Sequence, residues 1–226
     1  MKLTVLGNYG PYPNGKGTAC SSYLYEENGV KILLDFGSGA LANLSSICNP
    51  LDIDYIFISH LHFDHTSDIF PFRYMLEGTD KKINIITRSS DSDYYKVLFS
   101  DEHFNMINVS KDSELNILGL KLSFFNTAHP MPNLAVRIEG EKTFIYTGDT
   151  KYFDGIEQEL SGADVVLIDA LKPSTFNGPH MKAIEAISLQ KKLGGTYLLT
   201  HKSHYNLEEQ ENKNIIQTKI FSTYEF

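Results

Sequence analysis

The chain has 226 residues, of which 42% are hydrophobic and 12% aromatic, and its formal net charge is −8. This composition excludes a disordered chain and predicts a single globular domain over residues 1–226 with a sizeable core. The acidic balance argues against a general binder of nucleic acid, because such proteins usually carry a basic stripe.

Short apolar runs recur along the chain and predict a fold in which strands dominate. In chain order, strands are expected at Leu3–Leu6, Ser22–Tyr25, Lys31–Leu34, Tyr55–Ile58, Ile83–Thr87, Leu120–Phe125, Ala135–Ile138, Thr143–Tyr146, Val165–Ile168 and Tyr197–Leu199. The loop Gly7–Gly17 is rich in Gly, Pro and Asn, and it is either a long turn or the flexible wall of a pocket.

Helix-like stretches lie between these strands, which suggests sheets covered by helices. They are Leu41–Ile47, Thr66–Glu77, Asp93–Ser100 and His180–Leu193. In the last stretch one face is expected to hold Met181, Ile184, Ile187 and Lys191, and Gly194-Gly195 end the helix. The apolar residues of the second stretch predict a core or a homodimer face, with substrate stacking as the alternative; they are Phe70, Phe72, Tyr74, Met75 and Leu76.

Two features bear on where the protein works. No apolar run approaches the roughly 20 residues of a membrane helix, and the first residues do not resemble a secretory signal. Cys20 and Cys48 lie outside any CxxC pattern. We therefore expect both cysteines to be reduced and buried, in a cytoplasmic protein without a membrane partner.

Residues that carry chemistry collect at the ends of the predicted strands. Five strands finish in His or Asp, at His60, His129, Asp149, Asp169 and His201. Because open sheets bind ligands at the carboxyl ends of their strands, five such ends predict one shared site. Two other histidines lack this setting: His103 is expected to be structural or on the surface, and His204 is a weaker candidate for the rim of the site.

The densest cluster is HLHFDH, at residues 60–65. In an extended chain, residues 60, 62 and 64 point to one side and residue 65 to the other, so the chain must turn near Asp64 for the four polar side chains to converge. His60 and His62 can then hold one metal ion, while Asp64 and His65 face a second. Imidazole and carboxylate ligands suit Zn²⁺ best, and Mn²⁺ or Fe also fit. A closed structural zinc site is disfavoured, since the chain has only two cysteines.

This pattern resembles the metallo-β-lactamase-fold hydrolases, whose hallmark is H-x-H-x-D-H followed by His, Asp and His at later strand ends. The match covers nearly the whole chain: MKLTVLG, LLDFGSG at 33–39, ISHLHFDH, TAHPMPNLAVRI at 127–138, YTGDT at 146–150 and LLTH at 198–201. The resemblance implies an αββα sandwich of the α/β (α+β) class, in which two sheets pack face to face with helices outside.

The resemblance also implies two divalent metal ions and their ligands. One ion would take His60, His62 and His129; the other would take Asp64, His65 and His201; Asp149 would bridge them. Asp169 is expected to orient a ligand histidine, and Asp35 either supports the site or is a turn residue.

The branch of the family is indicated by two features. The secreted zinc β-lactamases usually have cysteine where this chain has Asp149, which argues against a lactamase. The stretch from 178 to 201 resembles the ribonuclease Z and small phosphodiesterase branch, in which a histidine that opens a helix assists at the phosphate; His180 fits that position. Ribonuclease Z proteins usually also carry an arm rich in Gly and Pro, and no such arm lies between His65 and His129.

The sequence therefore predicts a hydrolase of cyclic nucleotides or other small anionic phosphodiesters. A hydroxide that bridges the two ions would attack phosphorus, Asp64 would orient it, and His180 would donate a proton or a hydrogen bond. A helix-capping surface role is the alternative for His180, and Ser174–Gly178 is either a pocket wall or a plain turn. The alternative activities are a ribonuclease Z-like tRNA 3′ endonuclease, which acts on RNA, and a thioester or lactone hydrolase.

Overall fold

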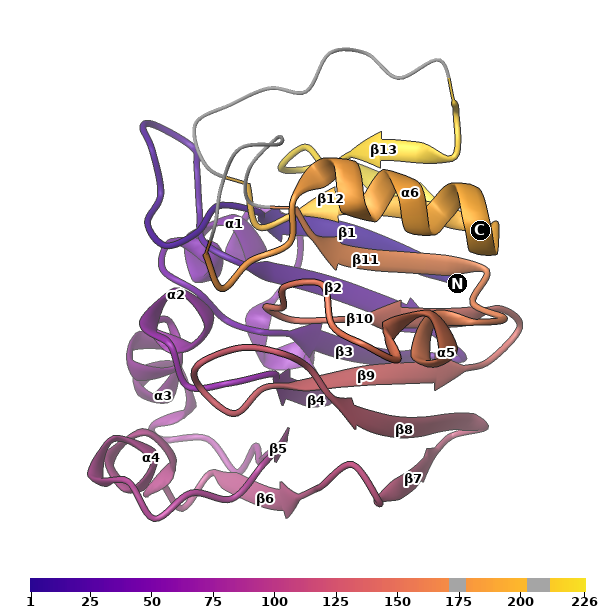
Figure 1. The fold of residues 1–226 in the computed structure, drawn as a ribbon. Helices are drawn as coiled ribbons and strands as arrows, with labels where there is room; N and C mark the ends of the chain where they lie inside the picture. Colours follow the sequence, from indigo (N-terminus) through magenta and orange to yellow (C-terminus); the bar gives the residue numbers. More distant parts are fainter. Residues whose placement is uncertain (171–177, 203–211) are drawn as a thin grey trace.

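Two sheets packed face to face form the centre of the molecule, with helices on their outer faces (Figure 1). The computed structural model describes residues 1–170, 178–202 and 212–226. Three apolar clusters match the layers: one lies between the sheets, and the other two lie between each sheet and its helices. The predicted αββα sandwich is confirmed.

The first sheet has the strand order β14-β1-β2-β3-β4-β5-β6. Its strands are β1 (Lys2–Gly7), β2 (Ser22–Glu27), β3 (Val30–Leu34), β4 (Tyr55–Ile58), β5 (Ile83–Thr87), β6 (Phe104–Asn108) and β14 (Thr223–Glu225). Strands β3 to β6 are parallel, so their carboxyl ends share one edge. The helical segments that follow these strands are α1 (Ala40–Ser45), η1 (Pro50–Asp52), α2 (Phe63–Thr66), α3 (Ile69–Leu76) and α4 (Asp93–Phe99). Leu44, Phe72 and Leu98 pack from these helices onto the outer face of the sheet.

The second sheet has the strand order β13-β12-β11-β10-β9-β8-β7. Its strands are β7 (Glu114–Ile117), β8 (Leu120–Asn126), β9 (Leu134–Glu139), β10 (Thr143–Tyr146), β11 (Val165–Asp169), β12 (Thr196–Thr200) and β13 (Ile215–Gln217). Because β8 and β10 both run antiparallel to β9, and β10 to β13 are parallel, the strands β8, β10, β11 and β12 end at one edge. α5 (Ile156–Leu160) and α6 (Ala183–Leu193) cover the outer face.

Aromatic contacts between the sheets fix how their edges face each other. The Tyr23 and Tyr146 rings are 5.3 Å apart, and Phe57 stacks on Phe124 at 5.9 Å. All four side chains are buried, and such ring pairs stabilise a core beyond the area they bury. The two sets of strand ends therefore meet at one side of the sandwich.

All ten predicted strands are present, and the structure adds β6, β7, β13 and β14. β13 and β14 have only three residues each and lie at sheet edges, where pairing with a neighbour rather than an apolar pattern defines the strand. The short helix α5 was also not predicted.

The predicted helix His180–Leu193 needs two corrections. It begins at Ala183, where Glu185 accepts a hydrogen bond from the Lys182 backbone N–H at 2.9 Å and caps the helix. The residues expected to share one face also differ in their surroundings, because Ile184 is 55% exposed whereas Met181 is buried and precedes the helix. The residues that the helix buries are Ala183, Ala186, Leu189 and Gln190. The end of the helix at Gly194 is confirmed.

Other expectations are settled by burial. Cys20 and Cys48 are both free; Cys20 is buried as predicted, whereas the burial predicted for Cys48 is wrong, since it is half-buried. In the aromatic stretch of α3, Phe72 and Leu76 lie in the core, while Tyr74 is 74% exposed.

Among the described residues, no helix has the length and apolar content to cross a membrane.

Candidate metal centre

The strand ends bring the seven predicted metal ligands together. His60 to His65 follow β4, His129 follows β8, Asp149 follows β10 and His201 follows β12 directly. The turn predicted near Asp64 is the start of α2, whose N-cap residue is His62. Nitrogen and oxygen atoms of these residues form two groups, of four and of three residues, and a third group joins Asp149 and His201 to His180. The contributing atoms of each group lie within 4.8 Å of one another.

The first group contains His60, His62, His129 and Asp149. The His62 Nδ1 atom lies 2.9 Å from His60 Nε2 and 3.2 Å from His129 Nε2. Asp149 Oδ2 lies 3.6 Å from His60 Nε2 and 3.9 Å from His129 Nε2. Three imidazole nitrogens and one carboxylate oxygen thus point at one small volume.

The second group contains Asp64, His65 and His201, which are all buried. Asp64 Oδ2 lies 3.6 Å from His65 Nε2 and 3.8 Å from His201 Nε2. The other oxygen of Asp149, Oδ1, lies 3.2 Å from His65 Nε2. Asp149 therefore stands between the two groups and turns one oxygen toward each.

The electrostatics keep most of these histidines neutral, which is the form that binds metal. Burial lowers the pKa of His60 and His62, with neighbouring histidines adding to the effect. Burial also lowers the pKa of His129 to about 4 and that of His201 to about 3. Four imidazoles are thus available with free lone pairs at neutral pH.

His65 behaves differently because carboxylates surround it. Burial opposes its charge, but Asp149, Asp64 and Asp35 together outweigh burial and raise the pKa of His65 well above its usual value. Burial likewise raises the pKa of Asp64 to about 6. The pKa of Asp149 falls well below its usual range, since His201 and His65 outweigh its burial. The centre thus stabilises positive charge next to Asp149.

Two buried atoms test whether the residues fit a metal ion. His65 Nε2 and Asp149 Oδ1 have no hydrogen-bond partner in the described structure, although they lie 3.2 Å from each other. An unsatisfied buried polar atom costs about 1–3 kcal/mol. A cation that both atoms ligate would remove this cost, and the His and Asp donors suit a divalent ion. The residues fit the implied metal.

Comparisons with known proteins identify the family of this chain. A family model described as the beta-lactamase superfamily domain matches residues 31–201, well over half of the chain. The chain belongs to the β-lactamase superfamily. It is 30% identical over 225 residues to the probable metallo-hydrolase YhfI of Bacillus subtilis (strain 168), across 94% of this chain and 91% of that protein. The crystal structure of YhfI, described as a metallo-β-lactamase fold protein, has a TM-score of 0.89 at 26% identity and covers 99% of this chain and 98% of its own.

More distant similarities extend to other members of the superfamily. The chain is 24% identical to a ribonuclease Z of Ignicoccus hospitalis, over 93% of this chain and 77% of that protein. The crystal structure of a diphosphatase from the PhnP family has a TM-score of 0.78 at 20% identity and covers all of this chain and 97% of its own, which shows the shared fold.

In this β-lactamase superfamily protein, further polar groups orient the histidine rings. Asp35 is fully buried and accepts hydrogen bonds from Ser59 N and Oγ at 2.7 Å and from Tyr146 OH at 2.6 Å; its Oδ2 lies 2.6 Å from His65 Nδ1. Ser59 Oγ also lies 3.1 Å from His60 Nδ1. The structure thus favours the supporting role for Asp35 over a plain turn residue, since it fixes the ring of His65 and, through Ser59, that of His60.

Asp169 holds His180. Asp169 Oδ2 lies 2.9 Å from His180 Nδ1, so the histidine that it orients is the predicted proton donor, whereas a metal-ligating histidine was expected. The pKa of His180 is raised because this contact outweighs its burial, and burial raises the pKa of Asp169 to about 7. His180 lies before α6 and does not open it. The helix-capping alternative is therefore wrong.

A cavity of about 390 Å³ opens onto the two groups of ligands. Its lining includes Asp64, Asp149 and His180 together with Pro11, so the loop Gly7–Gly17 is a wall of this cavity. Nothing in the sequence indicates that Gly10 lies against His201: a Cβ atom added at Gly10 would stand 2.1 Å from two atoms of that ring.

Residues 174–177 of the predicted pocket wall and His204 lie outside the described residues. His103 Nδ1 pairs with Asp101 away from the cavity, as expected for a structural histidine.

Proposed function

We propose that the protein is a metal-dependent phosphodiesterase that uses two divalent ions, with zinc as the native metal. The observation that carries the proposal is the position of Asp149, whose two oxygens face two different groups of ligands. One group would comprise His60, His62 and His129, and the other would comprise Asp64, His65 and His201. Ions bound there would supply Lewis-acid activation of a water molecule and of a phosphoryl oxygen.

The side chains around the ligands support phosphodiester chemistry. His180 lies in the same cavity, with its Nδ1 3.7 Å from Asp149 Oδ2 and 2.9 Å from Asp169 Oδ2. If Nδ1–H is donated to Asp169, the remaining nitrogen can carry a proton to the oxygen of the leaving group or donate a hydrogen bond to a phosphoryl oxygen. The contact with Asp169 outweighs burial and raises the pKa of His180, which favours its protonated form. Asp64 would accept a hydrogen bond from the attacking water and so orient it.

The substrate we propose is a small phosphodiester and not a long polyanion. The net charge is −8, so the overall field does not attract nucleic acid. Residues 66–128, where ribonuclease Z proteins carry their arm, fold into regular helices and strands of the sandwich. The sequence relatives include a ribonuclease Z, and the fold is shared with a diphosphatase of the PhnP family.

Cleavage of tRNA is a second candidate, because ribonuclease Z is among the sequence relatives. Specific cleavage of a precursor tRNA at its 3′ end would favour it over small diesters. A thioester or lactone hydrolase would be indicated by activity on those substrates, silence on phosphodiesters and indifference to His180→Ala.

The test couples metal analysis to hydrolysis of bis(4-nitrophenyl) phosphate. We expect two ions per chain and release of 4-nitrophenol, with loss of both an ion and activity in His62→Ala. His103→Ala is the matched control, because this histidine pairs with Asp101 away from the cavity. Metal-free protein with undiminished activity would refute the proposal.

A further inference from the structure

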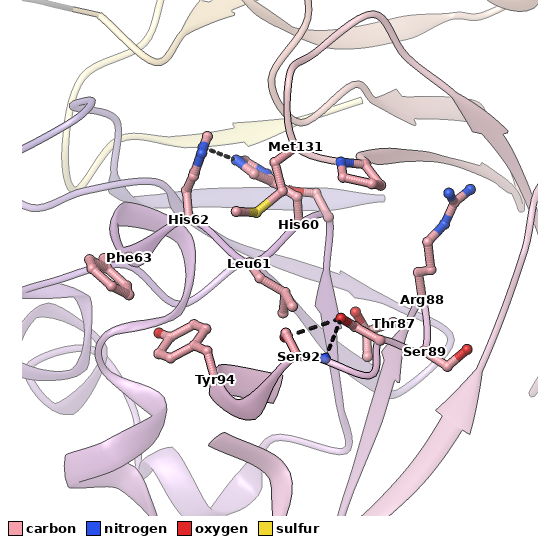
Figure 2. A pocket seen from close by; sticks show the side chains of 13 residues that line it. His60, Leu61, His62, Phe63, Thr87, Arg88, Ser89, Ser92, Tyr94 and Met131 are labelled. Atoms are coloured by element: carbon pink, nitrogen blue, oxygen red, sulfur yellow. Dashed lines mark hydrogen bonds between the residues drawn. The ribbon is translucent and has the colours of Figure 1, made fainter. Parts of the chain in front are cut away.

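A second cavity adjoins the metal centre (Figure 2). It has a volume of about 460 Å³ and lies between the segment that joins β4 to α2, the segment that joins β5 to α4, and the loop between β8 and β9. His62 and Phe63 line both this cavity and the one that opens onto the metal ligands. We call it the side pocket. A molecule whose phosphate lies at the metal centre could thus extend directly into the side pocket.

One side of the side pocket is aromatic. Phe63 is 69% exposed although it stands between His62 and the buried Asp64. Its ring lies 5.0 Å from the ring of Tyr94 in an edge-to-face arrangement, and the Tyr94 hydroxyl lies 2.7 Å from Thr66 Oγ1, which fixes that ring. Leu61, Met131 and Pro132 complete the apolar part of the lining. An exposed ring packed against a second, half-buried ring beside a cavity is suited to stack on a flat ligand.

The opposite side of the side pocket carries a guanidinium. Figure 2 shows Arg88 across the pocket from Phe63 and Tyr94, next to Thr87 and Ser89. Arg88 is half-buried, and its Nη2 donates a hydrogen bond to Asn126 Oδ1. Within the described part of the chain no carboxylate pairs with Arg88, although the protein is acidic. Its remaining N–H groups form a planar fork that suits a pair of acceptor atoms.

Together these features select one kind of ligand. An aliphatic chain would fill the apolar side but would leave the guanidinium desolvated without an acceptor. A sugar alone offers no flat aromatic face to the two rings. A flat aromatic ring with acceptor atoms along its outer edge satisfies both sides, and nucleobases have this chemistry.

We propose that the side pocket holds the base of a nucleotide substrate, with the ring against Phe63 and its acceptor edge toward Arg88. This inference rests on the proposed function, which places the scissile phosphate at the metal centre. It narrows the small phosphodiesters of the proposed function to nucleotides, and it makes Phe63 and Arg88 the residues that determine specificity.

The test compares a nucleotide with the sugar phosphate that lacks its base. Calorimetric titration of the metal-loaded protein with guanosine 5′-monophosphate and with ribose 5-phosphate measures the contribution of the base without any turnover. Stacking on an aromatic side chain predicts that the nucleotide binds roughly 5- to 150-fold more tightly. Phe63→Ala should remove most of this difference. Tyr74→Ala is the matched control, since Tyr74 is a similarly exposed aromatic residue (74%) that does not line the side pocket, and it should leave the difference intact.

The role of Arg88 is tested with the same pair of ligands. Arg88→Ala should weaken binding of the nucleotide and leave that of ribose 5-phosphate unchanged. Arg88→Lys should fail to restore it, because the planar fork is lost while the charge stays.

Two outcomes overturn the inference. One is equal affinity of the wild-type protein for both ligands. The other is an unchanged affinity ratio in a Phe63→Ala variant that still folds and holds its metal. The proposed function fails in a different way, by absence of diester hydrolysis from protein in which the base-dependent binding is present.

Discussion

A methyl group added at Gly10 would collide with a ring of the metal centre. In Gly10→Ala the new Cβ would stand 2.1 Å from Cε1 and Nε2 of His201. Because nonbonded heavy atoms approach to about 3.5 Å, the ring or the loop must move by about 1.4 Å. A zinc–nitrogen bond is about 2.0–2.1 Å long and tolerates deviations of about 0.2 Å. If the ring takes up this displacement, His201 can no longer serve as one of the proposed ligands.

We expect Gly10→Ala to hold fewer than two ions per chain after dialysis and to lose about 10²-fold in kcat/KM, as a 1 Å misplacement near the chemistry can cause. Metal content is measured by elemental mass spectrometry, and activity on a chromogenic diester. Gly15→Ala is the control in the same loop. Its φ of +101° makes the substitution strain the backbone, but no atom lies within 4 Å of the added Cβ, so the control tests loop strain without the His201 contact. If Gly10→Ala keeps two ions and wild-type kcat/KM, the reasoning about the His201 contact is wrong.

Three further predictions concern stability and access. Asp35→Asn should lower the free energy of unfolding, measured by urea titration, by about 3–5 kcal/mol, because an amide replaces a buried carboxylate that faces donor groups. Asp52→Asn, on an exposed side chain, should leave this free energy unchanged. If the metal ion is present at about a thousand times its Kd, its removal by a chelator should lower the melting temperature by about 8–16 °C. Added Zn²⁺ should restore the melting temperature. An unchanged melting temperature would contradict metal binding. Burial raises the pKa of the Cys20 thiol to about 12. In a thiol titration of the folded protein at pH 8, only Cys48 should therefore react. Rapid reaction of both thiols would contradict the burial of Cys20.

Much of the metal centre could be predicted from the sequence because its signals are local. His60, His62, Asp64 and His65 lie within six residues, and the other ligands each follow a recognisable apolar strand. In a sheet whose strands run the same way, their ends meet at one edge whatever the details of packing. The assignment of ions to these ligands stays a prediction that metal analysis would test.

The start of α6 could not be read correctly from local pattern. Met181, Ile184 and Ile187 have helical spacing, but the helix is rotated so that Ala183 and Ala186 face the sheet. Small residues let the helix lie close to β12, and this depends on a neighbour that is distant in sequence. The same limitation hid the contact between Asp169 and His180.

The sequence by itself determined the fold family and predicted a set of metal-binding side chains, because strand periodicity and ligand type are properties of short segments. Only the tertiary structure decided which groups stand beside that set. Gly10 against His201, Asp35 behind His65, and the pairing of Phe63 and Tyr94 across from Arg88 all join segments that lie far apart along the chain. Such contacts follow from how two sheets pack, and packing is fixed by the complementarity of many side chains at once. The motif thus predicts how water would be activated, while the folded surroundings support the proposal of what is bound.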